Sequence, residues 1–242
     1  MKILSLVLST LLLASCGGGG GGGPAAPTGP VASTSTFQLK QAYTNDFNET
    51  KTFPFTVSGT LTAGGNTGTV TGSGTLASSA ISNVTFEGAA ALSKTRTTSG
   101  SITVTVGATS TSQVLAPTTS TTLVSPAFDL VGFTGASSYS VPAGPITFPV
   151  TAKVGDSGSI GTFNTFTSAA KVGVPTTNAL SWALAADTAS TAVLNLTQIM
   201  RNAGGVVTAT QVDSYRLTPA GAVTPISAAA TLPGAGTLTF TF

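Results

Sequence analysis

Apolar and hydroxyl-bearing residues alternate along most of this chain from about residue 36 onward. Residues 101–106 show it clearly, with Ile102, Val104 and Val106 separated by serine and threonine. A period of two places every second side chain on the same face of a β-strand. Runs of this kind recur between turns rich in glycine, proline and asparagine, as at residues 63–66. The pattern therefore predicts a series of short antiparallel strands.

The last third of the chain carries the strongest strand pattern. Residues 180–184 alternate so that Leu180, Trp182 and Leu184 share a face. A turn at 187–190 leads into a long strand whose apolar positions fall on one face: Ala192, Leu194, Leu196 and Met200. A return strand at 206–217 places Gln211, Asp213 and Arg216 among small and apolar neighbours. Strands near 223–231 and 236–242 complete an antiparallel meander.

These runs predict an all-β fold, an antiparallel meander that forms a sandwich or an open barrel. A meander of this length must curl to bury its apolar face. No helix is expected in the β-rich domain, residues 36–242, and the proline-richer stretch 116–149 is expected to hold loops and short strands. The break at Val174-Pro175 is a possible boundary between two subdomains, although one continuous sheet system is favoured.

The N-terminus has the layout of a secretory signal peptide spanning residues 1–15. Lys2 supplies a positive charge, an apolar stretch follows over residues 3–13, and two small residues end the segment. Leu13-Ala14-Ser15-Cys16 resembles the lipobox of bacterial lipoproteins. That resemblance implies cleavage before Cys16 and attachment of two or three lipid chains, which together anchor a protein stably in a membrane.

Residues 16–35 are predicted to be a disordered tether that begins at the lipidated cysteine. Seven consecutive glycines, residues 17–23, are followed by a proline-rich segment, and this composition gives a flexible chain. Enterobacterial lipoproteins kept in the inner membrane tend to carry aspartate directly after the cysteine, whereas this chain has Gly17. The resemblance therefore implies a lipid-anchored envelope protein of the outer membrane. In composition, the β-rich body resembles uncharacterised lipoproteins of Gram-negative bacteria.

The charge content limits the classes of partner. Only 7% of the residues are charged and the formal net charge is +2, with no basic cluster. Binding to nucleic acid depends on such clusters, so nucleic acid is excluded as a partner. The membrane, reached through the lipid anchor, is the partner that the sequence predicts.

Two short motifs resemble those of serine enzymes but lack the residues that would make them work. Residues 155–158, Gly-Asp-Ser-Gly, resemble the nucleophile loop of chymotrypsin-like proteases, but the chain has no histidine to act as general base for Ser157. Residues 168–171 match the Ser-x-x-Lys motif of penicillin-binding proteins without its companion motifs, so Lys171 is interpreted as a surface residue on a strand. No enzymatic activity is expected.

No metal or cofactor site is expected. Histidine is absent, Cys16 is assigned to lipidation, and the seven acidic residues are spread along the chain. Their one local cluster, residues 46–49, lacks the spacing of a calcium-binding EF-hand and is interpreted as a solvated turn.

The favoured function is that of a lipid-anchored envelope protein with a non-catalytic β-domain in a binding or structural role. One alternative is a carrier of an apolar ligand, which would need a cavity beside Trp182, Leu194, Leu196 and Met200 in a curved sheet. Another is an outer-membrane β-barrel, because apolar residues alternate up to a terminal phenylalanine, Phe242, as in the assembly signal of such barrels.

Overall fold

The computed structural model describes residues 29–242, and the predicted signal peptide, Cys16 and the first part of the tether lie outside this range. It contains a helix, α2 (Leu39–Asn48), and thirteen strands. The strands are β1 (Thr52–Ala63), β2 (Asn66–Ser78), β3 (Ser82–Phe86), β4 (Ala89–Val106), β5 (Thr109–Val124), β6 (Leu130–Gly135), β7 (Ser138–Pro142), β8 (Ser157–Phe166), β9 (Thr176–Thr188), β10 (Thr191–Arg201), β11 (Val207–Leu217), β12 (Val223–Leu232) and β13 (Gly236–Thr241).

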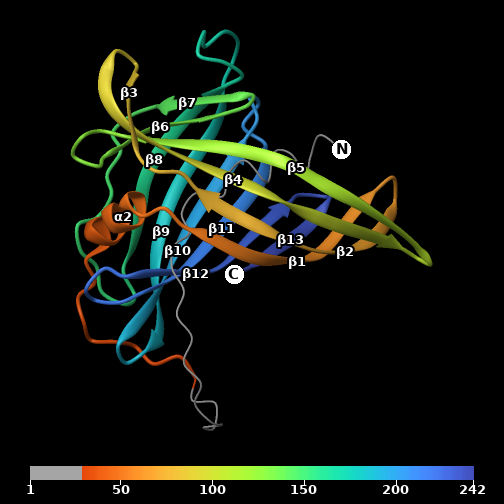
Figure 1. Ribbon diagram of the computed structural model, residues 1–242, viewed down its shortest axis with the longest axis horizontal. Coiled ribbons are helices and arrows are strands. Elements are labelled where there is room, and N and C mark those ends of the chain that lie inside the picture. Colours follow the sequence, from red (N-terminus) through yellow and green to blue (C-terminus); the bar gives the residue numbers. More distant parts are fainter. Residues whose placement is uncertain (1–28) are drawn as a thin grey trace.

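The strands form a closed antiparallel barrel (Figure 1). From β4 to β13 each strand pairs with the next along the chain, β13 then pairs with β1, and β1 pairs with β2. The β2–β4 pairing, which runs from Thr69↔Thr105 to Ser78↔Arg96, closes the ring. Twelve strands take part, and β3 is an extra strand that pairs with β4 outside the ring. The predicted all-β antiparallel meander is therefore confirmed, and its final shape is a barrel.

The sheet continues across residue 174, where a subdomain boundary was considered. Strands β8 and β9 flank this residue, and their pairing begins beside the intervening loop at Thr165↔Thr176. Both strands belong to the same thirteen-stranded sheet.

Alternation along the strands separates an apolar inside from a hydroxyl-rich outside. In β1, Phe53, Phe55 and Val57 are buried while Thr56 and Ser58 are exposed. Hydroxyl groups on the outer face pair across neighbouring strands, as between Thr103 Oγ1 and Ser112 Oγ at 2.8 Å. Burial of the inward apolar side chains supplies the main driving force for folding.

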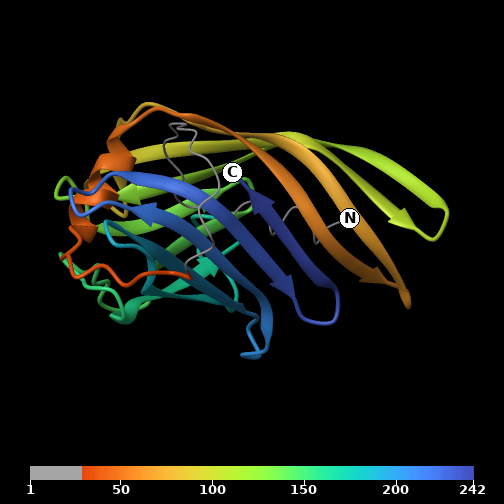
Figure 2. The same ribbon diagram turned by 90° about the horizontal axis from the view of Figure 1, so that it is seen from below.

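Helix α2 corrects the expectation that the β-rich domain has no helix. Its buried residues, Leu39, Ala42, Tyr43, Asp46 and Phe47, follow the spacing i, i+3, i+4, i+7 and i+8 of one helix face. The helix is short and contains threonine and asparagine, which have modest helix propensity. Its apolar spacing was therefore not distinguished from the strand patterns on either side. It lies across one end of the barrel, and the β4–β5 hairpin extends beyond the other end (Figures 1 and 2).

The expectation of a solvated turn at residues 46–49 is also wrong. Asp46 lies in the last turn of α2, is 2% exposed and faces the barrel interior. No helical segment among residues 29–242 combines the length and the hydropathy that crossing a bilayer requires.

Candidate binding site inside the barrel

Polar and charged side chains gather inside the barrel at the end that α2 covers. Lys94 and Arg96 lie on the inward face of β4, and Gln211 and Asp213 lie on that of β11. All four are buried, with exposed fractions between 2% and 5%. Their positions are two residues apart on each strand, so the same alternation that buries apolar residues elsewhere buries these polar ones.

A buried ion pair joins α2 to the barrel wall. Arg96 Nη2 lies 2.7 Å from Asp46 Oδ2, and the two side chains are 4% and 2% exposed. Asp46 Oδ1 and Arg96 Nε are buried and have no hydrogen-bond partner within the described residues. Removing two charges from water is costly, so such a pair fixes the position of the helix more than it adds to stability.

Lysine side chains hold both ends of α2. At its C-terminal end the Lys94 ammonium donates to the carbonyl oxygens of Asp46 (2.7 Å), Phe47 (3.1 Å) and Glu49. At its N-terminal end Lys40 donates to Asp129 Oδ1 at 2.6 Å. Burial, together with the nearby Arg96 charge, lowers the pKa of Lys94 to about 8. The helix is thus fastened over the barrel end by charge-assisted hydrogen bonds.

Asp213 is a buried carboxylate without a cationic partner. Its Oδ1 accepts a hydrogen bond of 2.7 Å from Gln211 Nε2, and no lysine or arginine of residues 29–242 forms an ion pair with it. Burial raises the pKa of Asp213 to about 7, although the Gln211 hydrogen bond and the Arg96 charge oppose this shift. A carboxyl group in this state can bind or release a proton near neutral pH.

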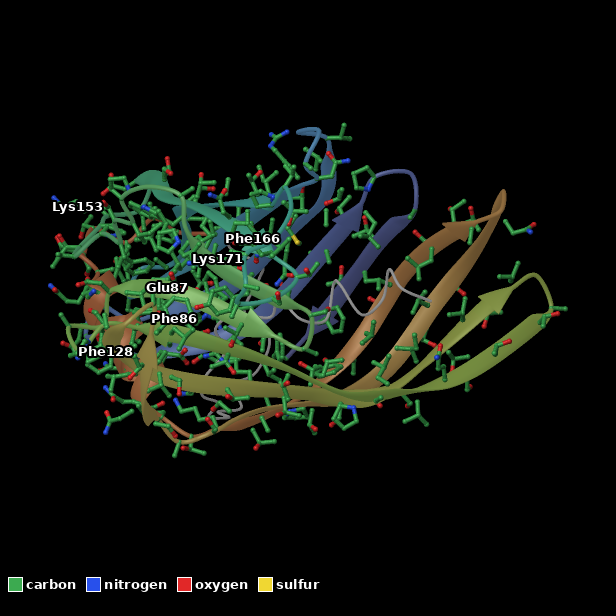
Figure 3. The ribbon with its side chains drawn as sticks, turned by 90° about the horizontal axis from the view of Figure 1, so that it is seen from above. Phe86, Glu87, Phe128, Lys153, Phe166 and Lys171 are labelled. Atoms are coloured by element: carbon green, nitrogen blue, oxygen red, sulfur yellow. The ribbon has the colours of Figure 1, made fainter. Side chains whose placement is uncertain are left out.

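A cavity of about 50 Å³ lies beside Asp213. Its lining combines aromatic rings, aliphatic side chains and a few polar groups: Tyr43, Phe128, Phe133, Phe148, Leu130, Ile160, Leu180, Leu196, Thr122, Ser181, Thr197, Gln198 and Asp213. Figure 3 marks Phe128 at the end of the barrel where α2 lies.

Two further polar groups of this lining have unused hydrogen-bonding capacity. Tyr43 Oη and Gln198 Nε2 are buried and lack a hydrogen-bond partner in the described part of the chain. With Asp213 and the hydroxyl groups of Thr122, Ser181 and Thr197, they are the polar groups of a largely apolar cavity. An apolar pocket with a small number of placed polar groups is the usual form of a small-molecule site.

Of the four residues of the predicted apolar cavity, three share the main core of the barrel and Met200 lies apart from them. Leu196 lines the cavity beside Asp213, and Leu194 joins it around a second cavity of about 20 Å³ under α2. Trp182 lies opposite Leu196 in the β9–β10 pairing and shares the main core with Leu194 and Leu196, whereas Met200 packs against a separate cluster that contains Ala209 and Leu232. The six-residue step from Leu194 to Met200 covers about 20 Å along a strand, so a shared face does not bring both to one site.

Tyr43, Gln198 and Asp213 were not predicted as site residues from the sequence. Tyr43 was hidden in the unrecognised helix. Asp213 carried a usable signal, because it lies in phase with Ala209, Tyr215 and Leu217 on the inward face of an alternating strand. Acidic side chains are rarely buried, so an acidic residue at an inward position indicates either a functional role or a paired charge.

The residues that resembled serine-enzyme motifs lie on the outer surface. Ser157 is exposed at the start of β8, and Ser168 is exposed in the loop that follows this strand. Lys171 lies in the same loop rather than on a strand, and its ammonium contacts Glu87 Oε2 at 2.5 Å (Figure 3). Glu87 also accepts a hydrogen bond from Tyr139 Oη at 2.5 Å, and the hydrogen bonds from Lys171 and Tyr139 lower the Glu87 pKa.

Within residues 29–242, no three acidic, histidine or cysteine side chains come together in a way that could hold a metal ion. The fold and the interior cavity define the class of protein, a closed antiparallel barrel with a helix across one end and a small mixed-polarity site beneath it. The chain matches no protein-family model, no curated protein and no solved structure.

Proposed function

We propose that this chain is a lipid-anchored protein of the bacterial outer membrane whose barrel is a non-catalytic, small-molecule-binding domain. The observation that carries the binding function is the interior cavity, where Tyr43 and Gln198 present unused hydrogen-bonding groups beside the buried Asp213 carboxyl group, among apolar walls. The lipobox resemblance at Cys16 supports the anchor.

The size of the cavity favours a small ligand over a lipid. A water molecule needs about 10–15 Å³ of such space, so about 50 Å³ corresponds to a ligand of roughly five non-hydrogen atoms. Drug-sized ligands occupy about 300–1,000 Å³. If the barrel is a carrier, its ligand is therefore a small molecule and not a lipid.

The outer face of the strands supports anchoring by lipid rather than by the barrel wall. A barrel that spans a membrane presents an outward apolar band with aromatic girdles. Here the exposed positions of β1 include Thr56, Ser58 and Thr60, and the large apolar side chains exposed within residues 29–242 are all valines.

Membrane fractionation and intact mass test the anchor. Wild type is expected in the membrane fraction with a mass that fits residues 16–242 plus acyl chains. Cys16→Ala is expected to lose both the added mass and the membrane association. An unmodified wild type that stays in the membrane together with the variant would overturn the anchor.

Native mass spectrometry of the protein purified from its host tests the binding function. A retained small molecule is expected, released on denaturation, and it should be absent when Leu196→Trp fills the cavity. Gly144→Trp, at an exposed loop residue, is the control that should keep the ligand. A ligand retained equally by both variants would place it outside the cavity.

A further inference from the structure

The lining of the cavity restricts the chemistry of its ligand, and this inference rests on the binding function proposed above. Asp213 is the only acidic side chain on the cavity among the described residues. Its Oδ1 accepts a hydrogen bond from the uncharged amide of Gln211, and no lysine or arginine within residues 29–242 forms an ion pair with the carboxylate. A carboxylate in such surroundings gains most from a positively charged hydrogen-bond donor.

The aromatic lining favours the same charge. Tyr43, Phe128, Phe133 and Phe148 all contribute to the walls, and the rings of Tyr43 and Phe148 have their centroids 5.3 Å apart. The face of an aromatic ring is electron-rich and attracts cations, most strongly where water is excluded. Rings beside a carboxylate form a typical environment for an ammonium group.

Neither of the buried cationic side chains Lys94 and Arg96 lines the cavity, so they offer little to an anion bound there. Arg96 is paired with Asp46, and Lys94 is bonded to the carbonyl oxygens at the end of α2. By contrast, Tyr43 Oη can accept a hydrogen bond from an N–H group. The Gln198 amide can do so through its oxygen once its terminal group rotates.

We propose that the cavity binds a small organic ammonium ion of roughly five non-hydrogen atoms, with Asp213 as its counter-ion and the rings of Tyr43, Phe128 and Phe148 around its apolar part. The N–H groups of the ammonium donate to Asp213, and one of them reaches Tyr43 Oη or Gln198.

Binding of this ion should depend on pH through Asp213. The titratable and charged groups on the elements packed around it are Arg96 and Lys94 on β4, Asp46 and Tyr43 on α2, and Tyr215 on β11. Tyr43 and Tyr215 have pKa values raised by burial, so they stay neutral below pH 8, and Lys94 stays protonated below about 8. As the pH is lowered from 7 to 5, a proton on Asp213 competes with the ammonium ion. The affinity for the ammonium ion should therefore fall about tenfold for each pH unit of that decrease.

Isothermal titration of the purified protein with isobutylammonium and with isobutanol tests the proposal. The two probes have the same shape and differ in charge. Isobutylammonium should bind at pH 7.5 at least tenfold more tightly than isobutanol and should weaken at least tenfold at pH 5.5. Asp213→Asn should abolish its advantage over isobutanol. Glu87→Gln, which removes a charge on the outer surface, should change nothing.

The outcomes separate the ligand class from the binding function. If isobutanol binds as tightly as isobutylammonium in wild type and in Asp213→Asn, the ammonium proposal is overturned while the small-molecule site stands. If neither probe binds at pH 7.5 and native mass spectrometry shows no retained ligand, both are overturned. Circular dichroism of Asp213→Asn establishes that any loss occurs in a folded barrel.

Discussion

At the scale of single residues, Asp213 links the stability of the barrel to pH. Its pKa is about 7 in the folded protein and 3.8 in an unfolded chain. Below pH 3.8 the carboxyl group is protonated in both the folded and the unfolded state, so its ionisation does not lower the stability of the fold. As pH rises towards 7 the unfolded chain releases this proton while the folded barrel keeps it, so stability falls by on the order of 4 kcal/mol.

Asp213→Asn should therefore be more stable than wild type at pH 7.5, by on the order of 4 kcal/mol, and nearly equal to it at pH 4. Urea unfolding at pH 4, 5.5 and 7.5 measures this difference. Equal pH profiles for the two proteins would show that Asp213 is not buried in its protonated form.

The ion pair between Arg96 and Asp46 gives a second residue-scale prediction. Arg96→Met should cost about 3–5 kcal/mol, because it leaves the Asp46 carboxylate buried without a partner. The double variant Arg96→Met with Asp46→Leu should recover most of that loss, since neither charge then remains. Urea unfolding of the two single variants and the double variant tests this, and additive losses would contradict it.

At the scale of elements, α2 depends on charges more than on its own helix propensity. Lys94→Met should destabilise the protein by about 1.5–3 kcal/mol, the range for a hydrogen bond to a charged group. The carbonyl oxygens at the end of α2 would lose their donor, so hydrogen exchange of the α2 amides should accelerate before that of the barrel strands.

Lys153→Met, at an exposed lysine in the loop before β8, is the matched control and should leave α2 exchange unchanged. Uniform acceleration throughout the barrel in Lys94→Met would show that α2 does not open separately.

At the scale of the whole molecule, the β2–β4 pairing decides whether the sheet closes. Gly74 and Gly100 lie opposite each other in this pairing. A Cβ atom at Gly74 would lie 2.2 Å from the Ser99 carbonyl oxygen and 2.5 Å from the Phe55 ring. The strands can approach this closely because neither residue has a side chain.

Gly74→Val should cost about 3 kcal/mol or more and lower the melting temperature accordingly, because the barrel must open or distort at the β2–β4 pairing. Gly144→Val, where a Cβ meets no atom within 4 Å, should have little effect. Equal melting temperatures for the two variants would show that close approach at Gly74 is not required for closure. Thermal unfolding followed by circular dichroism makes the comparison.

The alternation of apolar and hydroxyl residues was sufficient to determine the strands and the faces they bury. Because a strand has a period of two, spacing alone shows which residues share a face of the sheet. Examples are Phe53, Phe55 and Val57 in one strand and Leu180, Trp182 and Leu184 in another. The antiparallel order followed from short connections between successive strands. Helix α2 was missed because a single short helix face competes poorly with strand signals on both sides.

Only the tertiary structure decided that the sheet closes into a barrel and where the candidate site lies within it. Closure depends on pairing between β2 and β4, and no local pattern specifies it. The site brings Tyr43 of α2, Gln198 of β10 and Asp213 of β11 to one cavity, although they are separated by up to 170 residues. A periodic pattern fixes which face a side chain occupies, whereas the position along the barrel axis depends on strand register and on where the helix packs.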